Sequence, residues 1–421
     1  MNILVIGSGG REHAIIRKLN ESPKTEKIWC APGNGGIAAD AECVGIGAMD
    51  IEGVVKFAKE NPVDMVFVAP DDPLAAGMVD ALEKEGIRAF GPRANAAVIE
   101  SSKVFSKNLM KKYGIPTAAY EVFSDPAAAV QYIENEGKFP VVVKADGLAL
   151  GKGVIIAEDL DAAKAAVHDI MEDKVFGASG NNVVVEEFLT GPEVSVLAFT
   201  DGKSLQPMIS SKDHKRALDG DKGLNTGGMG TISPNPYYTD EIAKECMETI
   251  FMPTVRAMQA EGRPFKGCLY FGLMLTPNGP KVIEYNARFG DPETQVVLPR
   301  LVTDFVDVID AVIDEKLDTL NIEWSDDACA CVVMASGGYP QSYPKGLEIT
   351  GLDAGGQAEG VTVYHAGSKL TDGKLVTNGG RVLGVTAKAA TLDEALEKAY
   401  KAVETIHFDG VHYRRDIGRT K

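Results

Sequence analysis

Residues 1–19 read MNILVIGSGGREHAIIRKL, and this stretch sets the first expectation for the fold. The apolar run from Ile3 to Ile6 predicts a strand, and Glu12 to Leu19 predicts a helix. The same order returns downstream, with a strand predicted at 65–69 and a helix at 74–85. Alternating strands and helices are typical of a parallel sheet covered by helices, so we expect an N-terminal α/β substrate-binding domain over residues 1–100.

The rest of the chain predicts two further units, which makes the protein a multidomain α/β and α+β chain. Residues 101–326 predict a catalytic region, with strands at 267–275 and 281–285. Within it, residues 120–189 predict a small lid with strands at 141–145 and 154–157 and a helix near 162–171. Residues 327–421 predict a closing domain, with strands at 328–334, 361–365 and 381–387 and a helix at 392–406.

Composition restricts the partners. Among 421 residues, 60 Asp and Glu against 43 Lys and Arg give a net charge of -17, which disfavours nucleic acid and anionic membranes. No apolar segment predicts a membrane span and the N-terminus predicts no signal peptide, so we expect a cytoplasmic protein. The six cysteines suggest neither disulfides nor zinc, and Cys329 and Cys331 are expected to pack in the core.

The turn Gly7-Ser8-Gly9-Gly10-Arg11-Glu12-His13 follows a strand and opens a helix. Small residues at that position let backbone N–H groups approach a phosphate at the positive end of the helix. An NAD-dependent dehydrogenase is the alternative, but the spacing is not GxGxxG, and the segment from Trp29 to Asn34 provides no ribose-binding acid. A plain strand-to-helix turn also remains open.

The segment Lys144 to Val154 reads KADGLALGKGV, a lysine at the end of a buried strand followed by a glycine-rich turn. A strand-held ammonium with mobile backbone N–H groups suits the clamping of a nucleotide triphosphate. The order of residues is not that of a Walker A loop, and a plain flexible hairpin is the alternative.

Two further segments carry polar groups. The run Glu186-Glu187-Phe188-Leu189, followed by Glu193, ends a predicted strand and could read an adenine edge and a ribose, although a solvated strand end is the commoner outcome. Residues 213–230 read DHKRALDGDKGLNTGGMG, and Lys212 precedes them. The stretch 212–230 is charged and glycine-rich and has no hydrophobic period. We expect an irregular substrate loop there, in which His214 is a hydrogen-bonding residue rather than a general base.

The triplet Glu284-Tyr285-Asn286 predicts a metal site, because alternate strand residues point the same way and present two oxygen donors. Mg²⁺ suits two protein oxygens plus phosphate, and Mn²⁺ could replace it. Arg288, three residues before Asp291, supplies a guanidinium that could neutralise a transferring phosphoryl group. The polar face of a strand is the alternative explanation.

In their order along the chain, these motifs resemble the ATP-grasp superfamily, and the strings themselves are similar to the phosphoribosylamine–glycine ligase family. The resemblance runs nearly end to end and rests on GSGGREHA, KADGLALGKGV, VVEEFLTGPEVS, DHKRALDGDKGLNTGGMG and EYNARFGDPETQ. It departs at Ala69–Leu74, where Asp72 provides a shorter carboxylate than the family's glutamate.

The resemblance implies roles for individual residues. Catalytic roles fall to Arg288, Lys144 and Asp213. Contacts with ATP fall to Lys103, Lys144, Glu186, Glu187, Phe188, Leu189, Glu193, Lys215 and Asn225. Contacts with the other substrates fall to Gly9, Gly10, Arg11, Gly33, Asn34, Asp72 and Asp291. The metal ligands would be Glu284 and Asn286.

By the same resemblance, the chain would be a monomer that ligates glycine to 5-phosphoribosylamine through glycyl phosphate, with ATP and Mg²⁺. Two alternatives remain beside the dehydrogenase. One is an ATP-grasp ligase that carboxylates or formylates a purine intermediate. The other is a nucleotide-binding regulatory module without catalysis, against which Glu284, Asn286 and Arg288 argue.

Overall fold

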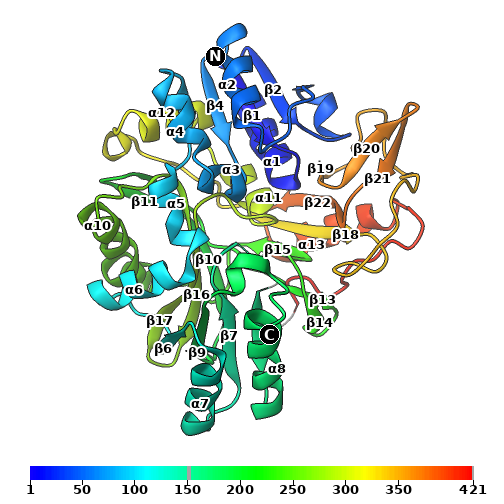
Figure 1. Cartoon of the computed structure of the whole chain (residues 1–421). Coiled ribbons are helices and arrows are strands. Elements are labelled where there is room, and N and C mark those ends of the chain that lie inside the picture. The colour runs from blue at the N-terminus through cyan, green and yellow to red at the C-terminus, as the bar shows by residue number, and fades with distance from the viewer. Residues whose placement is uncertain (149–152, 420–421) are drawn as a thin grey trace.

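The computed structural model describes residues 1–148 and 153–419, and its N-terminal part is built on a parallel sheet, as predicted (Figure 1). The strand order is β3-β2-β1-β4-β5. The strands are β1 (Asn2–Gly7), β2 (Lys27–Pro32), β3 (Glu42–Cys43), β4 (Met65–Val68) and β5 (Arg88–Phe90). Helices α1 (Gly10–Asn20) and α2 (Ile51–Glu60) complete two strand–helix units, so the opening pattern is confirmed.

The single helix predicted over 74–85 is wrong. The segment forms α3 (Asp71–Ala75) and α4 (Met78–Lys84) instead. Gly77 between them has a φ of 89°, a left-handed conformation that stops one helix and starts the next. Two helices then lead out of the domain, α5 (Ala94–Ser101), which the sequence did not predict, and α6 (Lys103–Tyr113), which begins at the lysine singled out above.

The lid is an antiparallel sheet of order β6-β9-β7-β8 with two helices packed on it, at the bottom of Figure 1. The strands are β6 (Tyr120–Phe123), β7 (Val141–Ala145), β8 (Val154–Ala157) and β9 (Val183–Glu187), and the helices are α7 (Pro126–Glu136) and α8 (Leu160–Met171). The predicted pairing of 141–145 with 154–157 is confirmed. Residues 149–152 of the glycine-rich turn between them lie outside the described residues.

The central sheet has the order β11-β10-β16-β17, and its inner strands β10 and β16 are mostly buried. Its strands are β10 (Glu193–Asp201), β11 (Leu205–Pro207), β16 (Lys266–Thr276) and β17 (Gly279–Asn286). Alternate residues of β10 enter different cores: Val196 belongs to the core that includes α10 (Met252–Ala260), and Leu197 belongs to the core that includes α12 (Phe305–Ile313). The sheet is thereby fixed against helices on both sides, which makes β17 a rigid support for the side chains at its end.

The last sheet joins segments that are far apart in sequence. Its order is β12-β15-β18-β22-β19, with α13 (Leu392–Val403) against it. The strands are β12 (Lys212–Asp213), β15 (Gly230–Ser233), β18 (Ala328–Ala335), β19 (Thr362–His365) and β22 (Arg381–Ala389). The domain boundary predicted at 326/327 remains a prediction, while this sheet shares strands from both sides of it.

Three details of this region were predicted with mixed success. Cys329 and Cys331 are buried on β18 within a hydrophobic core, so the packing interpretation is confirmed. The helix predicted to reach residue 406 ends at Val403, because the chain turns to pair His407 with Thr350. Residues 212–230 are not irregular, since β12 and β15 flank a hairpin of β13 (Arg216–Leu218) and β14 (Lys222–Asn225).

In the part of the chain that the structure describes, no helix is long and apolar enough to span a membrane.

Candidate active site

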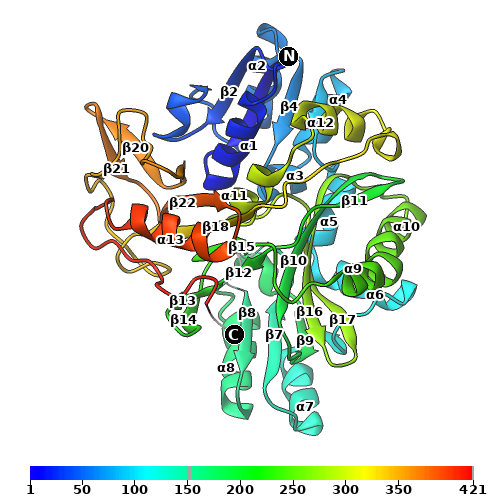
Figure 2. The ribbon, with the colours of Figure 1, turned by 180° about the vertical axis from the view of Figure 1, so that it is seen from behind.

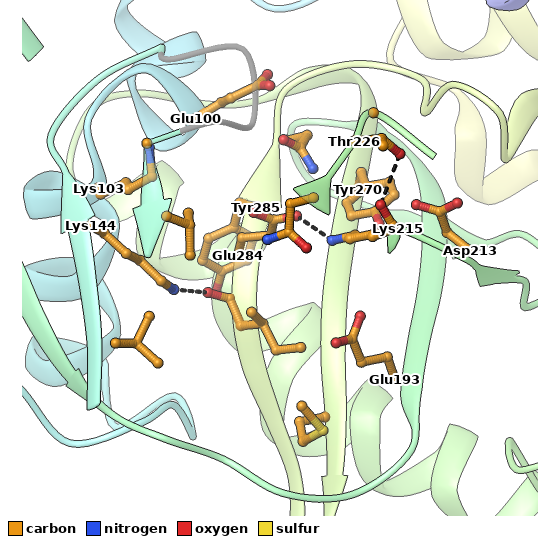
Figure 3. Close-up of a pocket in the computed structure, with 18 of the residues that line it drawn as sticks. Glu100, Lys103, Lys144, Glu193, Asp213, Lys215, Thr226, Tyr270, Glu284 and Tyr285 are labelled. Carbon is orange, nitrogen blue, oxygen red and sulfur yellow. Dashed lines mark hydrogen bonds and ion pairs between the residues drawn. The ribbon is translucent and has the colours of Figure 1, made fainter. Parts of the chain in front are cut away.

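A cavity of about 1020 Å³ lies where the N-terminal domain, the lid, the central sheet and the C-terminal domain meet. Figure 3 shows side chains from several elements turned toward this space. The residues singled out from sequence that line it are Arg11, Lys103, Lys144, Glu186–Leu189, Glu193, Asp213, Lys215, Asn225, Glu284, Asn286, Arg288 and Asp291. Segments from Arg11 to Arg381, far apart in the sequence, thus contribute to one site.

A buried cluster of two lysines and one glutamate forms the lid side. Lys144 on β7 donates to Glu186 Oε2 on the paired strand β9 at 2.9 Å, and Lys107 on α6 lies 3.1 Å from the same oxygen. Burial lowers the pKa of Lys107 to about 8, although the charge of Glu186 opposes this shift. Among the described residues, Glu186 Oε1 has no hydrogen-bond partner. The side chain of Glu186, which was expected near adenine, therefore holds Lys144 in place through Oε2, while Oε1 remains available as an acceptor.

Lys103 begins α6 and reaches across to the lid. Its Nζ donates to the carbonyl of Gly147, 2.8 Å away, in the turn after β7. Burial lowers its pKa, while the nearby Glu284 acts in the opposite direction. With Lys144, it brings a second ammonium to the end of the cavity next to the glycine-rich turn.

Glu284 and Asn286 occupy alternate positions on β17, and both line the cavity. Lys215 lies 3.1 Å from Glu284 Oε1, and this ion pair, drawn in Figure 3, outweighs burial and lowers the pKa of Glu284 to about 2. An ionised carboxylate and an amide oxygen on one strand face are the hard donors that a divalent cation prefers, so the residues fit such an ion.

Arg288 follows this strand and is held by Glu100 from α5. Its Nη2 lies 3.1 Å from Glu100 Oε1, and Glu100 Oε2 accepts the backbone N–H of Ala287 at 2.7 Å. Burial raises the pKa of Glu100 to about 7 even though Arg288 opposes the shift. Within the described chain, Arg288 Nε is buried without a partner. The guanidinium is thus fixed in position with hydrogen-bonding capacity to spare.

Two acidic side chains occupy the C-terminal side of the cavity. Burial, together with the neighbouring Glu293, raises the pKa of Asp213 well above its usual range. Glu293 is only 4% exposed, and its carboxylate makes no hydrogen bond or ion pair within the described residues. Arg381 of β22 lies close by, with Nη1 donating to the carbonyls of Gly227 (2.8 Å) and Asp291 (2.6 Å). A cationic group entering between the two acids would find unspent acceptors.

The N-terminal turn contributes less of the cavity wall than expected. Arg11 lines the cavity, and its backbone N–H donates to Asp291 Oδ2 at 3.2 Å. Gly9, Gly10, Gly33 and Asn34 are not among the described residues of the wall. The Asn34 side chain instead donates to the carbonyls of Ser8 and His365, which ties the turn to the C-terminal domain.

Of the two acids in the Ala69–Leu74 string, the structure places Asp71 in the cavity wall rather than Asp72, the one singled out from the sequence. Asp72 is exposed and lies outside the cavity wall formed by the described residues, whereas Asp71 lines it. Both open α3, and the first residue of that helix is the one that faces Arg288. The pKa of Asp72 is raised, first by burial and then by the charge of Asp71.

Comparison with known proteins identifies the family. Three family models match consecutive parts of the chain: the phosphoribosylglycinamide synthetase N domain (1–100), its ATP-grasp (A) domain (101–294) and its C domain (329–420). The chain belongs to this family. A phosphoribosylamine–glycine ligase from Caldanaerobacter subterraneus is 49% identical over 99% of both chains. The trifunctional purine biosynthetic protein adenosine-3 of Gallus gallus is 51% identical over 99% of this chain and 42% of its own length.

Solved structures agree with this assignment. The phosphoribosylamine–glycine ligase of Thermotoga maritima superposes with a TM-score of 0.87 at 35% identity, covering 99% of this chain and all of its own. A biotin carboxylase domain from Hydrogenobacter thermophilus, 17% identical over 98% of this chain and 91% of its own, gives a TM-score of 0.73 and shares the fold. The expected class, an ATP-grasp carbon–nitrogen ligase that uses ATP and a divalent metal, is confirmed.

The residues of this phosphoribosylglycinamide synthetase site that were missed from the sequence include Asp71, Glu100, Lys107, Glu293, Tyr339 and Arg381. Lys107 lies four residues after Lys103 on a helix, so both point to the same face, and that spacing could have revealed it. Tyr339 and Arg381 come from the C-terminal domain and carry no local signal. Only the fold brings them to the cavity.

Proposed function

We propose that this chain joins glycine to 5-phosphoribosylamine at the expense of ATP, giving glycinamide ribonucleotide, ADP and phosphate. The observation that carries the proposal is that one cavity brings together Lys144 of the lid, Lys103 and Lys107 of α6, the Glu-x-Asn pair of β17 and the Arg288 guanidinium. We also propose Mg²⁺ as the metal, with Mn²⁺ as a substitute, and a cytoplasmic monomer, since one chain supplies all the walls described.

ATP is proposed to lie with its adenine against Glu186–Leu189, its ribose near Glu193 and its phosphates near Lys103 and Lys144. Lys215 and Asn225 would border it from the β13–β14 side. Glu284 and Asn286 would hold the divalent ion, which when bound neutralises phosphate charge. The lid sheet pairs Lys144 with Glu186 before substrate arrives, so the ammonium needs no reorganisation on binding.

The chemistry then proceeds in two displacements. A carboxylate oxygen of glycine attacks the γ-phosphorus, the bond to the ADP oxygen breaks, and glycyl phosphate forms. The amine of 5-phosphoribosylamine attacks the acyl carbon, phosphate leaves with the bonding electrons, and the nitrogen loses a proton to give the amide. Arg288, held by Glu100, is placed to balance the charge of the transferring group. Water must be excluded meanwhile, because an acyl phosphate hydrolyses.

Glycine needs a place for its ammonium, and Asp213 with Glu293 is the proposed one. Burial and the neighbouring Glu293 raise the pKa of Asp213, and an ammonium between the two acids would favour the ionised form of Asp213. The carboxylate of glycine would then point toward Arg288 and the phosphates. We propose that 5-phosphoribosylamine enters from the N-terminal side, past Arg11, Asp71 and Asp291, near the turns at Gly9, Gly10, Gly33 and Asn34.

The decisive experiment measures ADP release and amide mass with ATP, Mg²⁺, glycine and freshly generated 5-phosphoribosylamine, and then with each component left out. Amide formation only in the complete mixture is the expected result. ADP release that ignores glycine, or that needs bicarbonate or formate instead, would point to another ATP-grasp substrate.

A further inference from the structure

The C-terminal segment 412–418 runs beside the β13–β14 hairpin, and Figure 2 shows the red end of the chain next to it. Six polar contacts join the two segments. They are His412 Nε2 to the Ala217 carbonyl (2.6 Å), Arg414 to the Arg216 carbonyl (3.1 Å) and to Asp221 (2.9 Å), Arg415 N–H to Asp219 Oδ1 (2.8 Å), Gly220 N–H to Asp416 Oδ2 (2.8 Å), and Gly418 N–H to His214 Nε2 (3.0 Å).

Arg414 is the centre of these contacts. Its side chain is 0% exposed, and its Nε and Nη2 donate in parallel to the two oxygens of Asp416 at 2.8 and 2.9 Å. Nη1 is left for the hairpin, where it meets Asp221 and the carbonyl of Arg216. The planar guanidinium of Arg414 can bind Asp416 through two nitrogens and the hairpin through the third, whereas a lysine ammonium lacks this fork geometry.

Asp221 also fits this contact through its backbone. Its φ is 54°, a left-handed conformation that Asp and Asn tolerate better than other non-glycine residues. The hairpin tip is therefore shaped to present this carboxylate to Arg414. Asp221 remains half exposed, so its own removal does not open a core.

The contacts bear directly on the cavity, because its wall includes His214 as well as Arg216 and Asp221 of the hairpin. Burial lowers the pKa of His214 to about 4, and the neutral ring donates from Nδ1 to Gly230 and accepts from Gly418 at Nε2. Side chains alternate along an extended segment, so fixing His214 on one side directs Asp213 and Lys215 to the other. Lys215 there forms the ion pair with Glu284 of the metal strand.

We propose that segment 412–418 is a positioning element for the active site, with Arg414 as its positioning residue. It holds residues 213–228, which include the β13–β14 hairpin and are called the loop below, so that Asp213 and Lys215 keep their positions in the cavity. The inference rests on the proposed function for its readout in turnover, and on hydrogen exchange of the loop for a readout that does not need turnover.

The test compares Arg414→Met, Arg414→Lys and Asp221→Asn with Arg415→Met. Arg415 is the matched control, because its side chain is exposed on the same segment and only its backbone N–H contacts the hairpin. We expect Arg414→Met to lower kcat by about tenfold to a hundredfold, the usual cost of misplacing a reacting group by about an ångström. The KM for 5-phosphoribosylamine should stay within about twofold, since its proposed contacts lie on other segments.

Arg414→Lys should retain more activity than Arg414→Met, and Asp221→Asn, which keeps the backbone preference, should lower kcat in the same direction. Amide exchange within 213–228 should rise in all three while the central sheet stays protected. Turnover of Arg414→Met and Asp221→Asn equal to that of Arg415→Met, or unchanged exchange of the loop, would overturn the proposal. If the wild type makes no amide, the proposed function fails, and the exchange data alone still decide whether the tail holds the loop.

Discussion

Removing the Lys144 ammonium separates its role in phosphate binding from its role in stability. In Lys144→Ala, Glu186 keeps one cationic partner, because Lys107 remains 3.1 Å from its Oε2. The stability loss should therefore stay below the roughly 3–5 kcal/mol that follows when a buried charge loses its whole partner. Catalysis should fall separately, since removing one preorganised electrostatic donor costs about 2.7–4 kcal/mol, which lowers kcat by about a hundredfold to a thousandfold.

The assay measures ADP release in the complete mixture, with a thermal melt of each protein alongside. Lys138→Ala is the control, because Lys138 also belongs to the lid but its side chain is 83% exposed. The control should match the wild type in both measurements. A kcat for Lys144→Ala within about threefold of the wild type would refute the role of this lysine, as would a loss explained entirely by unfolding at the assay temperature.

Three further outcomes are expected. Glu186→Gln should destabilise the protein by about 3 kcal/mol or more, because two buried lysines lose their shared anion, and urea unfolding measures this; an unchanged midpoint would contradict the cluster. Asp71→Ala should lower kcat/KM for 5-phosphoribosylamine at least about tenfold while Asp72→Ala leaves it nearly unchanged, and steady-state kinetics with equal effects would reject the assignment. Burial lowers the pKa of His214 and His365 to about 4, so below about pH 6.5 these histidines bind protons in the unfolded chain but not in the folded one. Each histidine should therefore lower the free energy of unfolding by up to about 3 kcal/mol as the pH falls from about 6.5 to about 4. Urea midpoints that do not change in this window would disprove this.

Much of the fold follows from local patterns. The runs at 141–145, 154–157 and 328–334 are rich in β-branched or small apolar residues, and each is a strand; the predicted pairing of the first two is also present. The helix over 74–85 was misjudged because Ala-Ala-Gly-Met keeps an apolar period through Gly77, and only the backbone conformation shows the break. The shared sheet of β12, β15 and β18 could not be foreseen, because strand pairing across about 100 residues has no local signature.

The site was predicted as far as its motifs are continuous in sequence. Glu284 and Asn286 lie at the end of β17 and Arg288 follows two residues later, so spacing alone places them together. Choosing between Asp71 and Asp72 requires the start of α3, since adjacent residues of a helix face directions about 100° apart.

The charge of the cavity explains how a chain with a net charge of -17 can accept two phosphate-bearing substrates. The ammonium groups of Lys103, Lys107 and Lys144 gather at the lid end, while Asp213 and Glu293 lie toward the C-terminal domain. Charges this close act on a substrate in a poorly screened space, so their local arrangement outweighs the diffuse negative charge of the surface. The two acids also favour one orientation of a substrate that carries a carboxylate and an ammonium: its ammonium faces Asp213 and Glu293, and its carboxylate faces away from them.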